Sequence, residues 1–70
     1  RRVKNIAHAR QVAMYLVRTM THDSLPEIGR KFNKDHTTVL TSVRKIESLK
    51  GSDAQLQLEL GELQSKLSGV

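Results

Sequence analysis

The stretch SLPEIGRKFNKDHTTV, residues 24–39, decides the fold. At its start, Ser24 and Glu27 have capping-box spacing, in which each side chain bonds the backbone amide of the other residue. Pro26 falls in the first turn of the next helix, where its missing amide hydrogen costs little. Apolar side chains then recur at i, i+3 and i+7, so a short helix is predicted over residues 25–32.

A very short break separates this helix from the next. Asn33 is among the few residues besides glycine that tolerate the left-handed conformation which ends a helix, and Asp35 can cap the second helix. That longer helix is predicted over residues 36–49, before Gly51. Its apolar stripe comprises Val39, Leu40, Val43 and Ile46. A short helix, a tight turn and a longer helix together predict a helix-turn-helix.

Two more helices are predicted, one on each side of this unit. In the first, over residues 5–20, the apolar side comprises Ile6, Ala9, Val12, Ala13, Leu16, Val17 and Met20. The opposite side is mostly polar, with basic residues, and comprises Arg10, Gln11, Met14 and Arg18. The other helix covers residues 53–67, and Ser52 and Gln55 have capping-box spacing at its start. Its stripe of Leu56, Leu60, Leu63 and Leu67 is too short for several heptads, so it is interpreted as core rather than as a dimer zipper.

These patterns predict an all-α fold, a small helical domain containing a helix-turn-helix. Seventy residues suffice for one domain, interpreted as a basic linker at 1–4, a helical body and a C-terminal helix within 51–70. With no initiating Met, the chain is interpreted as a fragment of a longer protein. Residues 1–50 carry 11 Lys and Arg against four Asp and Glu, a net charge of +7 where the whole chain carries +5, which favours a polyanionic partner.

Several function classes find no support in the composition. The absence of cysteine excludes disulfides and thiolate metal sites, and the three histidines lack His-x-x-x-His spacing. There is no Gly-rich phosphate loop and no apolar run of about 20 residues that could span a bilayer. We therefore expect neither an enzyme nor a cofactor or metal, and a cytoplasmic location.

The side chains that open the longer helix suit contact with base edges in the major groove. Threonine offers a hydroxyl and a methyl group, histidine can donate or accept, and Asp35 can accept from the amine of cytosine or adenine. Each also has a plainer interpretation: Asp35 as a helix cap, His36 as a surface histidine, and Thr37 and Thr38 as helix-end hydrogen bonders. Other basic side chains, including Arg30, Lys31 and Lys66, are interpreted as solvated.

Four blocks of sequence carry a resemblance to a known family. They cover residues 9–16, 24–29, 35–40 and 44–46. Together they resemble the C-terminal DNA-binding domain of the bacterial replication initiator family DnaA, and the resemblance extends over about residues 2–50. The resemblance implies a Trp-repressor-like helical bundle that binds double-stranded DNA, at the short asymmetric DnaA boxes of the chromosomal origin. It implies a monomer associated with the nucleoid. ATP is implied only for the family's ATPase module, which this sequence lacks.

The resemblance also assigns site residues. Major-groove base contacts are implied for Asp35, His36, Thr37, Leu25, Pro26 and Lys34. Arg2 is implied to enter the minor groove. Phosphate contacts are implied for Arg10, Gln11, Arg18, Ser24, Thr38 and Lys45. The sequence departs from the family pattern where Ala9 replaces a frequent Pro, Asn33 replaces Gly, and Lys34 replaces Arg and so loses a forked contact.

Other functions stay open from sequence alone. A helix-turn-helix transcriptional repressor would typically bind palindromic DNA as a dimer. A protein-interaction module would use the leucine stripe of residues 56–67 as a docking face. Acidic phospholipids fit the basic first helix as secondary partners.

Overall fold

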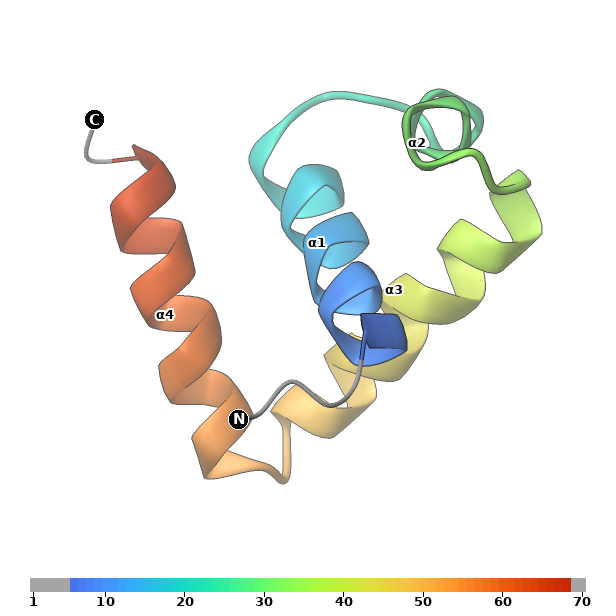
Figure 1. Cartoon of the computed structure of the whole chain (residues 1–70). Helices are drawn as coiled ribbons and strands as arrows, with labels where there is room; N and C mark the ends of the chain where they lie inside the picture. Colours follow the sequence, from blue (N-terminus) through green and yellow to red (C-terminus); the bar gives the residue numbers. More distant parts are fainter. Residues whose placement is uncertain (1–5, 69–70) are drawn as a thin grey trace.

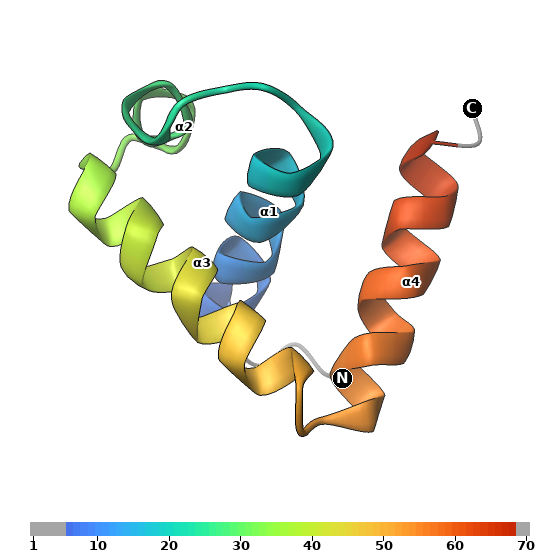
Figure 2. The same cartoon turned by 180° about the vertical axis from the view of Figure 1, so that it is seen from behind.

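The computed structural model describes residues 6–68, which form four helices. In chain order these are α1 (Ile6–Met20), α2 (Leu25–Phe32), α3 (His36–Lys50) and α4 (Ala54–Ser68). α1 packs against each of the other three, and α2 and α4 lie on opposite sides of it (Figures 1 and 2). The all-α class and the helix-turn-helix of α2 and α3 are confirmed.

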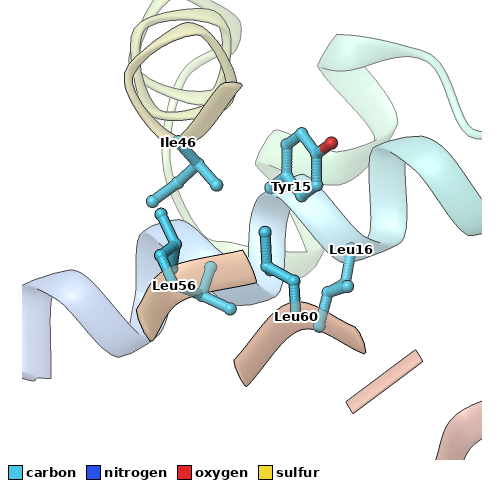
Figure 3. Packing of buried hydrophobic residues seen from close by; sticks show 6 residues of the cluster. Tyr15, Leu16, Ile46, Leu56 and Leu60 are labelled. Carbon is cyan, nitrogen blue, oxygen red and sulfur yellow. The ribbon is translucent and has the colours of Figure 1, made fainter. Parts of the chain in front are cut away.

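Two groups of buried side chains hold the helices together, one on each side of α1. The first joins α1 to α3 and α4 and comprises Val12, Tyr15, Leu16, Ile46, Leu56 and Leu60. Figure 3 shows Leu56 and Leu60 reaching from α4 toward Ile46 and Tyr15. The second joins α1 to the helix-turn-helix and comprises Met14, Ile28 and Val39. Val43 of α3 packs against both groups and links them.

The prediction for the faces of α1 was partly wrong. Met14, placed on the polar face, is only 1% exposed, because α2 and α3 cover that side while α4 covers another. A helix covered on two sides has a wider buried arc than one amphipathic stripe predicts. Ile6 and Met20, placed on the apolar face, are 71% and 37% exposed at the two ends of α1. Ala9 is exposed as well.

The turn between α2 and α3 is fixed by backbone geometry. Asn33 adopts φ 59°, in the left-handed region, as predicted. The amide of Lys34 then donates to the carbonyl of Gly29 at 2.8 Å, which folds the chain back on α2. A Cβ atom on Gly29 would collide with the carbonyl oxygen of Lys34 and lie 3.3 Å from the carbonyl carbon of Asp35. Only glycine lets the turn approach α2 this closely.

The start of α4 differs from its prediction. Asp53, not Ser52, caps the helix, since its Oδ1 accepts from the amide of Leu56 at 3.1 Å. The Ser52 amide instead donates to the carbonyl of Leu49 at 3.0 Å, which keeps Ser52 in the preceding turn.

The leucine stripe of α4 is core only in its first half. Leu56 and Leu60 are buried and Leu63 is half-buried. Leu67 is 55% exposed and lines an open apolar groove with Leu16, Val17 and Met20 of α1. The core interpretation was therefore wrong for Leu67, which lies in the last turn of α4 at the edge of this groove.

Candidate nucleic-acid interface

The first turn of α3 lies at the end of the molecule farthest from α4, beside α2 (Figures 1 and 2). His36, Thr37 and Thr38 are all exposed there, while Val39 directly after them is fully buried against α1 and α2. The buried residue fixes the direction of the helix, and the three polar side chains before it are left at the surface. The arrangement leaves the opening of α3 accessible to a large ligand.

Asp35 is the N-cap of α3, as its plainer interpretation predicts. Its Oδ1 accepts from the amide of Thr38 at 2.9 Å. Hydrogen bonding from Thr38, by its side chain and then by its backbone amide, lowers the pKa of the Asp35 carboxyl, and the nearby His36 acts in the same direction. The carboxylate form is therefore favoured. The residue is exposed, and a carboxylate has about four lone-pair positions, so it can accept from a further donor.

α2 contributes both polar and apolar groups next to this turn. Ser24 and Glu27 form the predicted capping box, with amide-to-side-chain distances of 2.8 and 3.3 Å. Ser24 Oγ accepts within this box, so its hydroxyl proton is available to an outside acceptor. Pro26 is exposed, whereas Leu25 is half-buried against the group of Met14, Ile28 and Val39 and presents only part of its side chain. Lys34 is exposed in the turn.

A row of side chains on α1 runs alongside the helix-turn-helix. Gln11, Met14 and Arg18 are spaced i, i+3 and i+7, so they share one face of the helix. Met14 is buried against Ile28 and Val39, which places this face over α2 and α3. Gln11 is half-buried and Arg18 is exposed, at the two ends of the row.

Arg18 and Arg10 differ in how they are held. The Arg18 Nη1 atom donates to the carbonyl oxygen of Asp23 at 3.1 Å, which ties α1 to the loop before α2. Arg10 is exposed and precedes Arg18 by two turns of α1. At about 1.5 Å per residue, the two positions lie about 12 Å apart along the helix axis. Lys45 is exposed in the middle of α3, beyond the first-turn residues. Arg2 lies outside the described residues and is not placed.

The interpretation of Lys31 as simply solvated was incomplete. Its Nζ forms an ion pair with Asp23 Oδ2 at 2.5 Å. The carbonyl oxygen of the same residue accepts from Arg18. No sequence pattern indicates this contact, because the two residues lie eight positions apart and on opposite sides of a helix start. The loop between α1 and α2 therefore gathers two cations that sequence analysis treated separately.

Two kinds of feature were not found in the described part of the chain, a group of metal-ligating side chains and a membrane-crossing helix. Residues 6–68 contain no group of three or more His, Cys, Asp or Glu side chains that could hold a metal ion. None of their helices combines the length and apolar character needed to cross a membrane.

Comparison with known families complements this geometry. The family described as "Bacterial dnaA protein helix-turn-helix" matches residues 1–46. The chain belongs to this family. Membership supports DNA binding by the domain, and it agrees with the helix-turn-helix that α2 and α3 form.

Curated relatives agree along almost the whole chain. Proteins named "Chromosomal replication initiator protein DnaA" from Bradyrhizobium sp. (strain ORS 278) and Rhodopseudomonas palustris (strain BisA53) are each 56% identical over 68 residues, which is 96% of this chain. The protein of that name from Burkholderia vietnamiensis is 54% identical over 70 residues, or 99% of this chain. The chain spans only 13–14% of the length of these relatives.

Proposed function

We propose that the domain binds double-stranded DNA in a sequence-specific manner and recognises DnaA boxes at the chromosomal origin, where replication is initiated. The observation that carries the proposal is the exposed first turn of α3, held beside α2 in a chain of the DnaA helix-turn-helix family. The relatives carry the name chromosomal replication initiator, which supports the origin as the target.

Contacts to the DNA backbone set the position of the domain on the duplex. The proposed phosphate ligands are Arg10, Gln11, Arg18, Ser24, Thr38 and Lys45. Gln11 and Arg18 share the face of α1 that lies over the helix-turn-helix, and Ser24 keeps a hydroxyl proton to donate. We expect about 4–8 phosphates to be engaged, with a matching dependence of affinity on salt.

Contacts to base edges then set the sequence. His36 and Thr37 are exposed at the start of α3 and enter the major groove first. Asp35 uses one carboxylate oxygen to cap α3, and the other accepts from the amine of cytosine or adenine. Pro26, the exposed part of Leu25 and the Lys34 ammonium extend the same contact surface.

Some parts of the proposal rest on the family resemblance alone. Arg2 enters the neighbouring minor groove, where narrow A·T-rich sequence attracts arginine. The domain acts as a monomer in the cytoplasm, at the nucleoid, and needs no bound ATP. Acidic phospholipids, proposed from the basic side of α1 and not from the resemblance, are a secondary partner.

The decisive experiment is selection of bound duplexes from a random pool, followed by titration against one selected site and a scrambled version of it. We expect a single asymmetric sequence, and a complex whose mass corresponds to one domain per site. A palindromic sequence bound by two domains would instead favour a transcriptional repressor. Equal affinity for selected and scrambled duplexes would contradict sequence-specific binding.

A further inference from the structure

The loop between α1 and α2 holds two cations around one acidic residue. Arg18 Nη1 donates to the backbone carbonyl of Asp23 at 3.1 Å, and the Lys31 ammonium pairs with the Asp23 carboxylate at 2.5 Å. The Asp23 amide in turn donates to Thr21 Oγ1 at 3.2 Å. Backbone and side chain of Asp23 are thus both fixed, and each fixes one cation.

Most of the hydrogen-bonding capacity of these cations is unused by the loop. An ammonium has three donors and a guanidinium five, and Asp23 takes one from each. The Lys31 side chain remains 62% exposed although it is paired, whereas the Asp23 side chain is only 24% exposed. The anchored carboxylate is therefore turned inward and the ammonium outward.

The neighbouring residue points to the ligand of this cluster. Ser24 comes directly after Asp23, and its hydroxyl proton is not used by the capping box. Arg18 and Ser24 are both proposed phosphate ligands, and they lie on either side of the residue that holds Lys31. Two carboxylates, Asp23 and Glu27, lie beside the two cations, so an anion would be held by the unused donors of Arg18, Lys31 and Ser24 rather than by an excess of positive charge.

We propose that Lys31 is a further ligand of the DNA backbone, and that Asp23 is the residue that positions it beside Arg18. The proposal rests on the DNA-binding function proposed above and adds one phosphate contact to it. A phosphate suits the site because an ammonium is a compact, strongly hydrated point charge, and because its neighbours Arg18 and Ser24 are themselves proposed phosphate ligands. Lys31 therefore contributes to affinity on any sequence and not to the choice of sequence.

The first test is Lys31→Ala, titrated at several salt concentrations against a selected duplex and its scrambled version. We expect affinity to fall by about threefold to tenfold on both duplexes, and the slope of log K against log salt to become less steep by about 0.9. Lys31→Arg keeps the charge and is expected to retain the wild-type slope.

A matched control removes the same charge elsewhere. Lys66 is exposed on α4, on the opposite side of α1 from α2 (Figures 1 and 2), so Lys66→Ala is expected to change affinity by less than about twofold. Lys31→Ala behaving like Lys66→Ala in both affinity and slope would overturn the proposal. Thermal unfolding checks that both variants are folded, since an exposed ion pair contributes little to stability.

Asp23→Asn tests the positioning role. This variant keeps the backbone carbonyl that accepts from Arg18 and removes the carboxylate that holds Lys31. We expect the affinity factor lost by Lys31→Ala to be clearly smaller in the Asp23→Asn background than in the wild type. The same factor in both backgrounds would show that Asp23 positions nothing.

The scrambled duplex separates this proposal from base recognition. A wild-type domain that binds both duplexes equally contradicts the sequence-specific function, yet the effect of Lys31→Ala on affinity and slope still decides the phosphate contact. A domain that prefers the selected duplex, with an unchanged slope in Lys31→Ala, retains its function and refutes the contact. A domain that binds neither duplex overturns both.

Discussion

The two sides of α1 are built in different ways. On one side, the helix-turn-helix is fixed by a capping box, a left-handed Asn33 and a glycine pressed against the turn. On the other side, α4 is attached mainly through Leu56 and Leu60, and Leu67 in its last turn is largely exposed. The surface proposed to contact DNA is thus set by backbone geometry, whereas the supporting helix is set by a few apolar contacts.

The largest expected effect is on stability and compares a glycine on each side of α1, Gly29 in α2 and Gly61 in α4. Gly29→Ala forces a Cβ atom against the Lys34 carbonyl, so the turn must move, and we expect a loss of about 3 kcal/mol in unfolding free energy. Gly61→Ala meets nothing within 4 Å and is expected to stabilise α4 by about 0.5–1 kcal/mol. Denaturant unfolding measures both. Equal effects of the two substitutions would remove the contrast between the two sides.

The next effect separates base contacts from phosphate contacts within the DNA-binding side. His36→Ala and Thr37→Ala are expected to weaken binding to the selected site by about 1–3 kcal/mol, and to weaken binding to scrambled DNA less. Arg18→Ala is expected to weaken both by similar factors. Fluorescence anisotropy titrations measure each. An equal loss on both duplexes for His36→Ala and Thr37→Ala would show that these residues do not discriminate sequence.

The smallest effect concerns the cap of α3 in acid. The pKa of Asp35 is lowered in the folded state by hydrogen bonding from Thr38. The ionised carboxylate therefore stabilises the folded state relative to the unfolded state. This contribution is present above the ordinary pKa of 3.8 and is lost as the pH falls through the lower, folded value. Asp35→Asn, a neutral cap, should therefore lose less stability than wild type across that range. Parallel acid unfolding curves for the two proteins would contradict this expectation.

Much of the fold was predictable because its signals are local. The capping box, Asn33 and the helical spacing of apolar residues placed the described helix ends within about one residue. Met14 was misplaced because its burial depends on which sides of α1 are covered, and that is a tertiary property. The cap at Asp53 was missed because Ser52 offered the same local pattern one residue earlier.

The candidate site was predictable to a different degree. The exposure of His36 and Thr37 followed from the opening of the longer helix, and the cap at Asp35 followed from its residue type. The pairing of Asp23 with Lys31 has no periodic signal, so only the folded loop brings it into view. The DNA contacts themselves remain predictions, including that of Arg2 outside the described residues.

The helix cap at Asp35 has a consequence for how such a domain could change its target. One carboxylate both starts α3 and, in the proposed complex, accepts from a base. Replacements at this position must still begin a helix well, which favours Asn, Ser, Thr or Gly. Evolution toward a new binding site is therefore freer at Thr37, where no structural duty limits the choice, than at its neighbour two positions earlier.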